Sequence, residues 1–191
     1  MIEYLDRIDQ EIFLLLNGFH NEFFDTIMFW ITNQETWYPF YAIILIWMFW
    51  KFRRNAIIPL VLIILVITIS DQVTSSLMKP FFERLRPCHD PEIQDLVHTV
   101  SGCGGIYGFA SGHAANSFAL ATLLFLFYRQ ESRYWILVYL WAAIVAYSRI
   151  YVGVHYPGDI IAGGLIGTGA GGAAYGAYSK LPPRLTVTDK S

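Results

Sequence analysis

The chain has 191 residues, of which 55% are hydrophobic and only 15% are charged, and its formal net charge is −2. A soluble domain usually carries about 25% charged residues, so the composition favours a membrane protein. The small net charge and the lack of a basic block argue against nucleic acid as a partner. The first residues do not show the basic region and cleavage site of a signal peptide, so we expect the first membrane spans to direct insertion.

Residues 4–19 carry apolar side chains at helical spacing with polar residues between them, which predicts an amphipathic helix lying at the membrane surface. Apolar runs predict six spans, at about 21–33, 36–51, 56–79, 111–128, 134–150 and 157–178. A helix needs about 20 residues to cross the hydrocarbon core, so several runs are short, and whether 21–33 spans fully stays open. The predicted fold class is all-α: an integral membrane six-helix bundle with an N-terminal amphipathic interfacial helix.

The basic residues predict the orientation of the bundle. The segment 51–54, the turn 129–133 and the polar tail 180–191 fall on one side, which the positive-inside tendency makes cytoplasmic. The segment 80–110, rich in proline and glycine as a loop should be, then lies on the outer side together with the stretch 148–159. We therefore expect one membrane domain over the whole chain, with its polar stretches meeting at the outer rim.

Two cysteines, Cys88 and Cys103, lie in the outer loop. In an oxidising compartment a disulfide between them would close a short loop and contribute about 3 kcal/mol in the chain-entropy model. Free thiols are an alternative, and the nearby His89 and His98 leave a zinc site conceivable.

The stretch Ser148–Asp159 lies between two apolar runs yet holds an arginine, a histidine and an aspartate. Charged groups at the edge of a membrane span are costly and usually functional. Pro157 suits the first position of a helix, so His155 lies just outside a helix N-terminus, where an anion is favoured. Asp159 can fix the tautomer of His155 and leave its other nitrogen free to attack, while Arg149 offers donors for phosphate. A histidine of this kind, taken alone, is more often part of a connecting loop.

Two further clusters lie at the same rim. Lys79 and Arg86 follow the third apolar run, where an isolated pair would be interfacial anchors. Ser111 is a good N-cap for the fourth run, Gly112 lets a ligand approach the backbone, and His113 is placed to donate a proton. Three cations, a helix-end cradle, two histidines and a single carboxylate indicate phosphoryl transfer without a metal ion.

The last apolar run repeats glycine every fourth residue, at Gly163, Gly167 and Gly171. Small residues at this spacing let helices approach closely in lipid. We interpret this row as a packing surface without chemistry of its own.

The three clusters resemble the signatures of the type 2 phosphatidic acid phosphatase superfamily. That family has a lysine separated by six residues from Arg-Pro, then Pro-Ser-Gly-His, then Ser-Arg followed by a spaced His and Asp. The matching segments here are Lys79 through Arg86-Pro87, Ala110-Ser111-Gly112-His113, and Ser148-Arg149 through His155 to Asp159. Order and spacing match, and the one departure is Ala110 where the family usually has proline.

The resemblance implies a role for each of these residues. His155 would attack phosphorus and become a phosphohistidine, Asp159 would orient it, and His113 would protonate the leaving oxygen. The phosphoryl oxygens would be held by Lys79, Arg86, Ser111, Gly112 and Arg149. The resemblance implies neither a metal ion nor another cofactor.

The resemblance also implies a membrane lipid phosphate or diphosphate as the substrate: undecaprenyl diphosphate, phosphatidylglycerol phosphate or phosphatidic acid. A lipid A phosphatase is an alternative within the same chemistry, and a non-catalytic lipid transporter or scaffold with a vestigial site is an alternative of another class. We expect a multi-pass protein of the bacterial inner membrane with its site on the periplasmic side. The sequence does not select the head group, the chain length or the oligomeric state.

Overall fold

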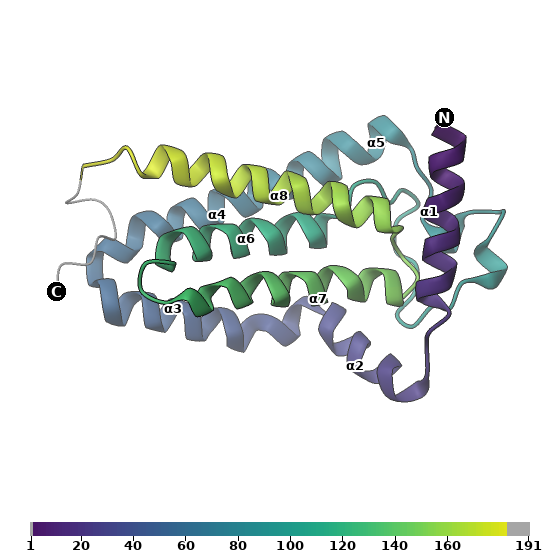
Figure 1. Cartoon of the computed structure of the whole chain (residues 1–191), viewed down its shortest axis with the longest axis horizontal. Helices are drawn as coiled ribbons and strands as arrows, with labels where there is room; N and C mark the ends of the chain where they lie inside the picture. The colour runs from purple at the N-terminus through teal and green to yellow at the C-terminus, as the bar shows by residue number, and fades with distance from the viewer. Residues whose placement is uncertain (1, 183–191) are drawn as a thin grey trace.

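The computed structural model describes residues 2–182, which form a bundle of helices (Figure 1). The helices are α1 (Ile2–Asn17), α2 (Glu22–Thr32), α3 (Tyr38–Phe52), α4 (Ile57–Gln72), α5 (Lys79–Phe82), α6 (Gly112–Tyr128), α7 (Leu137–Tyr151) and α8 (Pro157–Tyr178). A π-helical segment, Val73–Met78, joins α4 to α5. Residues 2–182 contain no β-strand, and the predicted all-α fold class is confirmed.

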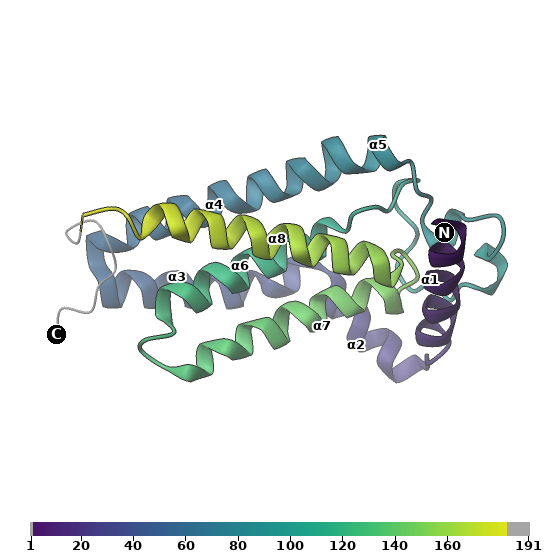
Figure 2. The same ribbon diagram turned by 45° about the horizontal axis from the view of Figure 1, so that its top comes forward.

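The two ends of the bundle differ in construction. Helices α3, α4, α6, α7 and α8 run along the bundle axis, and α1 crosses one end of it at a steep angle (Figures 1 and 2). The chain between α5 and α6 lies at that same end. We call the end formed by α1, residues 83–111 and residues 152–156 the loop end, and the opposite one the aromatic end.

The long helices carry apolar side chains on the outside of the bundle. Ile46 is 70% exposed, Leu165 is 69% exposed and Leu140 is 58% exposed. Two helical runs, Gln34–Phe82 and Arg133–Tyr151, are long and apolar enough to cross a membrane, and the first folds back on itself between α3 and α4. Soluble monomers seldom expose apolar patches beyond a few hundred Å², whereas lipid-facing helices require them.

Two predicted segments remain untested. Helix α2 has 11 residues, about half of what crosses a hydrocarbon core, so the span at 21–33 stays a prediction. Most of the predicted tail 180–191 lies outside the described residues.

The glycine row of α8 lets that helix contact α6 backbone to backbone. A Cβ atom at Gly163 would lie 2.4 Å from the carbonyl oxygen of Ser111, and one at Gly167 would lie 2.0 Å from that of Ala115. Both helices begin at the loop end (Figure 1). Their close contact therefore aligns their N-termini, where the Ser111 N–H donates to the Asp159 carbonyl oxygen at 3.1 Å.

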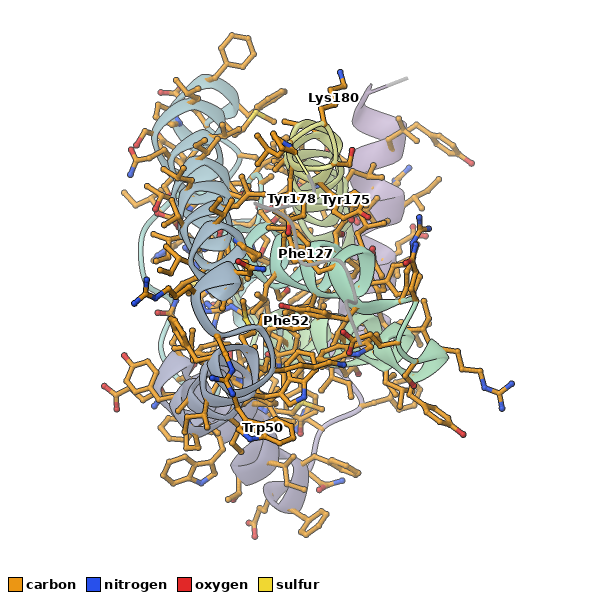
Figure 3. The ribbon with its side chains drawn as sticks, turned by 90° about the vertical axis from the view of Figure 1, so that its left-hand side faces the viewer. Trp50, Phe52, Phe127, Tyr175, Tyr178 and Lys180 are labelled. Carbon is orange, nitrogen blue, oxygen red and sulfur yellow. A yellow bond between two sulfur atoms is a disulfide. The ribbon has the colours of Figure 1, made fainter. Side chains whose placement is uncertain are left out.

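The aromatic end is closed by stacked and edge-on rings. The ring centroid of Tyr128 lies 4.8 Å from that of Trp47 and 5.3 Å from that of Phe52, and the Phe127 and Tyr178 centroids are 4.9 Å apart. Figure 3 looks along the bundle from this end and shows Phe127 and Tyr178 among the helix ends. Lys51 and Glu131 add an ion pair at this end, which is otherwise held by aromatic packing.

Candidate active site

His155 and Asp159 form a buried pair at the start of α8. Tyr156 is the N-cap of α8, so Asp159 falls at the third helical position and its Oδ2 accepts from the Tyr156 N–H at 3.0 Å. The same oxygen lies 3.2 Å from Nδ1 of His155, and the two side chains are 2% and 0% exposed. A carboxylate at Nδ1 favours the tautomer that carries its proton there, which leaves the Nε2 lone pair free to attack.

Burial keeps the imidazole of His155 neutral. It lowers the pKa of His155 to about 4, with Arg86 and Arg149 acting in the same direction and Asp159 opposing them. Above about pH 5 the ring is therefore unprotonated in the folded protein, which is the form that a nucleophile requires.

The backbone before His155 is fixed by a residue that the sequence analysis did not single out. The side-chain amide of Asn17, at the end of α1, donates to the carbonyl oxygens of Ile150 at 3.2 Å and Tyr151 at 2.8 Å. Gly153 has a φ of +81°, and a Cβ atom there would lie 2.6 Å from the carbonyl oxygen of His98. The loop that presents His155 is thus held by α1 on one side and by residues 97–99 on the other.

Three cations converge on this pair without carboxylates of their own. Arg86 donates to the carbonyl oxygens of Tyr107 at 3.3 Å and Cys103 at 3.2 Å, and Arg149 donates to the hydroxyl of Thr32. Nε of Arg149 is buried without a hydrogen-bond partner in residues 2–182. None of the ion pairs among the described residues includes Lys79, Arg86 or Arg149. Buried positive charge with spare donors favours an anionic ligand.

Gly108 marks the point where the outer loop meets the pair. A Cβ atom there would lie 3.0 Å from Asp159 Oδ2, 3.3 Å from Arg86 Cγ and 3.6 Å from His155 Nδ1. The Gly108 N–H donates to the carbonyl oxygen of Arg84 at 2.8 Å, which keeps this strip of backbone in place. A side chain at position 108 would therefore press against Asp159 and Arg86, which would have to shift by a few tenths of an ångström.

The start of α6 supplies the remaining predicted residues. Ser111 is the N-cap, its hydroxyl accepting from the Ala114 N–H at 3.4 Å, and His113 lies in the first turn. His113 lies in electrostatic range of Arg149, His155, Arg86 and Lys79. The structure therefore brings the sequence-predicted residues to one end of the bundle: Lys79, Arg86, Ser111, Gly112, His113, Arg149, His155 and Asp159.

An apolar cavity of about 320 Å³ begins at His113 and runs between the helices toward the aromatic end. It is lined mainly by α3, α4, α6 and α7, with Tyr41, Met48, Leu120 and Trp141 among its walls. Because His113 belongs to both the polar cluster and the cavity lining, the two together suit a ligand with an anionic head and a hydrocarbon tail.

The structure joins Cys88 to Cys103 in a disulfide, with the Cα atoms 5.9 Å apart. The neighbouring histidines make other contacts: His89 Nε2 lies 3.3 Å from the carbonyl oxygen of Gly104, and His98 Nε2 lies 2.9 Å from Oδ1 of Asp25. Within residues 2–182 no group of three or more histidine, cysteine or acidic side chains is arranged to hold a metal ion.

A helical bundle with an apolar exterior and unpaired cations gathered beside two histidines at one rim is the arrangement expected of a membrane-embedded lipid phosphatase. Comparison with protein families places the chain within that class. The model of the PAP2 superfamily matches residues 60–182, and the chain belongs to that superfamily. The resemblance seen in the three motifs is confirmed.

Individual relatives agree with this assignment. The chain is 42% identical to the lipid A 4'-phosphatase of Bacteroides thetaiotaomicron over 191 residues, covering 97% of this chain and 83% of that protein. It is 37% identical to the lipid A 4'-phosphatase of Porphyromonas gingivalis, covering 93% of this chain and 75% of the relative. A crystal structure of a transmembrane PAP2 type phosphatidylglycerolphosphate phosphatase from Bacillus subtilis superposes with a TM-score of 0.73 at 22% identity, covering 94% and 89% of the two chains. The protein is a membrane lipid phosphatase of the PAP2 type.

Proposed function

We propose that this protein hydrolyses the phosphate monoester of a lipid A molecule through a phosphohistidine intermediate on His155. The observation that carries the proposal is the set of three cations without carboxylate partners around the buried His155–Asp159 pair, with His113 of the same site lining an apolar cavity. The similarity to two lipid A 4'-phosphatases supports lipid A as the head group. Undecaprenyl diphosphate, phosphatidylglycerol phosphate and phosphatidic acid are the competing substrates.

In the first step Nε2 of His155 attacks phosphorus, and the bond from phosphorus to the lipid oxygen breaks. His113 gives a proton to the leaving oxygen, and Asp159 stabilises the positive charge that develops on the imidazole ring. In the second step His113 takes a proton from water, which attacks the phosphohistidine and releases phosphate. The phosphoryl oxygens are held through both steps by Lys79, Arg86, Arg149, the Ser111 hydroxyl and the Gly112 N–H.

We further propose that the loop end faces the periplasm of a bacterial inner membrane and that the chain forms one membrane domain. The aromatic end carries Lys51, Arg53, Arg54 and Arg129, which the positive-inside tendency assigns to the cytoplasm. The Cys88–Cys103 disulfide at the loop end fits an oxidising compartment.

Phosphate release from a panel of purified lipids tests the proposal. We expect lipid A to be hydrolysed with the highest kcat/KM, with vanadate inhibiting. His155→Ala should lower turnover by at least about 1,000-fold because the nucleophile is gone. His89→Ala is the matched control, because His89 lies at the same end without contacting the pair, and should leave turnover within about twofold of wild type.

Four outcomes would contradict three separate parts of the proposal: the head group, the nucleophile and the enzymatic activity itself. Faster hydrolysis of another lipid would overturn the assignment of lipid A as the substrate but would leave the proposed phosphatase activity standing. More than a tenth of wild-type turnover in His155→Ala, or no acid-labile phosphoprotein during turnover of ³²P-labelled lipid A, would overturn the nucleophile. Phosphate release from none of the lipids would favour the transporter or scaffold.

A further inference from the structure

Arg84 lies inside the first motif, between Lys79 and Arg86, but its contacts differ from theirs. Its Nη1 donates to Oδ1 of Asp159 at 3.0 Å. Its Nη2 lies 2.8 Å from Oδ2 of Asp9, a residue of α1. Arg84 is thus a paired cation, and it contacts the carboxylate oxygen of Asp159 that His155 does not contact.

The contact with Arg84 completes the coordination of the Asp159 carboxylate. Oδ2 of Asp159 serves the His155 ring and the Tyr156 N–H, while Oδ1 serves the guanidinium group. Because both oxygens have partners from different elements, rotation of the carboxylate would break at least one charge-assisted bond. The orientation of His155 therefore depends on a residue that never touches its ring.

Arg84 is itself held from several directions. Its guanidinium carbon lies 4.3 Å from the centroid of the Tyr156 ring, and the Tyr156 hydroxyl donates to Asp90 at 2.7 Å. Burial disfavours the charge of Arg84, but Asp159 and Asp9 more than offset this and raise the pKa of Arg84. Asp6 adds a contact at 3.1 Å that is half exposed and contributes little.

Asp9 connects this network to the surface helix. Its Oδ1 accepts from the Gly158 N–H at 2.8 Å, so one carboxylate binds both Arg84 and the first turn of α8. The same helix exposes the apolar side chains of Leu5, Ile12 and Leu15, which would meet lipid in the interfacial position predicted for α1. A path of direct contacts therefore runs from the membrane-surface helix through Asp9, Arg84 and Asp159 to His155.

We propose that Arg84 is a positioning residue of the phosphatase, which Asp9 of α1 holds against Asp159 so that His155 keeps its attacking orientation. The proposal rests on the proposed role of His155 as the nucleophile. It assigns α1 a part in catalysis that requires no contact between α1 and the lipid phosphate.

Arg84→Met and Asp9→Asn test the proposal in the purified full-length protein. Methionine keeps an unbranched apolar stem and removes the donors and the charge. Asparagine keeps an amide oxygen for the Gly158 N–H but places an NH₂ group against the guanidinium. Arg7→Met is the matched control: Arg7 is exposed on α1, the helix that carries Asp9, and borders the same polar cleft as Arg84.

The measurements are kcat and KM for lipid A, thermal unfolding, and the ¹⁵N spectrum of the five histidines. The signals of His155 are those that disappear from the spectrum of His155→Ala.

We expect Arg84→Met to lower kcat about 10- to 100-fold with KM within about twofold, the range found when partners that orient a metal-bound histidine are lost. Asp9→Asn should lower kcat about threefold to tenfold, and Arg7→Met should change neither parameter. Because Asp159 fixes the tautomer of His155, Arg84→Met should also shift its ¹⁵N signals toward a tautomer mixture. A merely structural role would lower the unfolding temperature and the active fraction without moving these signals.

Unchanged kcat in a folded Arg84→Met protein would overturn the positioning role. If that variant does not fold, Asp9→Asn provides the test. A wild-type kcat in Asp9→Asn would contradict the proposal that α1 holds Arg84 against Asp159. Both results leave the proposed function intact while His155→Ala is inactive. An active His155→Ala protein would instead remove the proposed function, whatever Arg84 does.

Discussion

The loop end and the aromatic end of this bundle are held together by different kinds of contact. At the loop end, Asn17, Arg84 and Asp159 each hold backbone or side chains of two or more elements through hydrogen bonds of 2.8–3.2 Å. At the aromatic end, Tyr128 contacts Trp47, Phe52 and Trp135 through ring packing alone, with centroids 4.8–5.3 Å apart. Directional bonds fix the positions of individual atoms, whereas ring packing fixes a volume.

The difference follows from what each end has to do. Phosphoryl transfer requires that the attacking nitrogen and the charge-stabilising donors lie within fractions of an ångström of their reactive positions. The aromatic end only has to keep the helices together, and several ring arrangements serve that purpose equally well. We therefore expect substitutions at the loop end to change kcat or KM first and those at the aromatic end to change stability first.

The largest effect is expected from a substitution that disturbs both ends at once. Gly167→Ala places a Cβ atom 2.0 Å from the Ala115 carbonyl oxygen, so α6 and α8 must separate. We expect a loss of more than about 4 kcal/mol of stability and no folded enzyme, measured by thermal unfolding and phosphate release. Gly169→Ala is the control, because a Cβ atom there meets nothing within 4 Å. A folded and active Gly167→Ala protein would contradict the backbone contact.

The glycine row also shows what the sequence could predict. Spacing of four residues in an apolar run predicted close helix packing, and the structure places Gly163 and Gly167 against backbone oxygens of Ser111 and Ala115. The motif spacings likewise predicted that Lys79, Arg86, His113 and His155 would meet at one rim. Local periodicity and helix-end chemistry are encoded over a few residues, so they can be read without coordinates.

The contacts that hold the site could not be predicted in the same way. Arg84 appeared only as a spacer between Lys79 and Arg86, and Asp9 only as part of the polar face of a surface helix. The pairing of Arg84 with Asp159 joins residues 75 positions apart, Asp9 accepts from Gly158 across 149 positions, and Asn17 reaches Ile150 across 133. Periodicity shows which face of α1 is polar. It does not show which element packs against that face, because this depends on the packing of segments far apart in the sequence.

A smaller effect, confined to one end, is expected from Phe127→Ala. The ring of Phe127 is buried against Tyr175 and Tyr178, at centroid distances of 5.7 and 4.9 Å. Truncation should cost about 3 kcal/mol, at the low end for a core phenylalanine because lipid offers no hydrophobic transfer term. The folded fraction should keep wild-type kcat and KM, whereas Trp50→Ala, at a 78% exposed side chain, should change neither stability nor turnover. A lowered kcat in folded Phe127→Ala protein would show that the two ends are coupled.

The smallest effect on stability is expected from the paired substitution Cys88→Ser with Cys103→Ser. The disulfide closes a separation of 15 residues, for which chain entropy sets an upper value of about 3 kcal/mol. We expect about 2 kcal/mol, because the backbone bonds between Arg86 and Ile106 and between Gly108 and Arg84 keep the loop partly closed.

Unlike Phe127→Ala, the loss of the disulfide should also weaken substrate binding. Nη1 of Arg86 donates to the carbonyl oxygen of Cys103, so a looser loop leaves the cation proposed to bind phosphate less well placed. If Arg86 holds the phosphoryl group equally in the ground state and in the transition state, as the proposed mechanism has it, KM for lipid A should rise a few-fold with kcat nearly unchanged. Kinetics of the serine variant beside wild type, with and without reductant, measure this. If stability falls and KM stays the same, Arg86 is positioned by its backbone pairing alone, and the loop end tolerates more freedom than its directional bonds indicate.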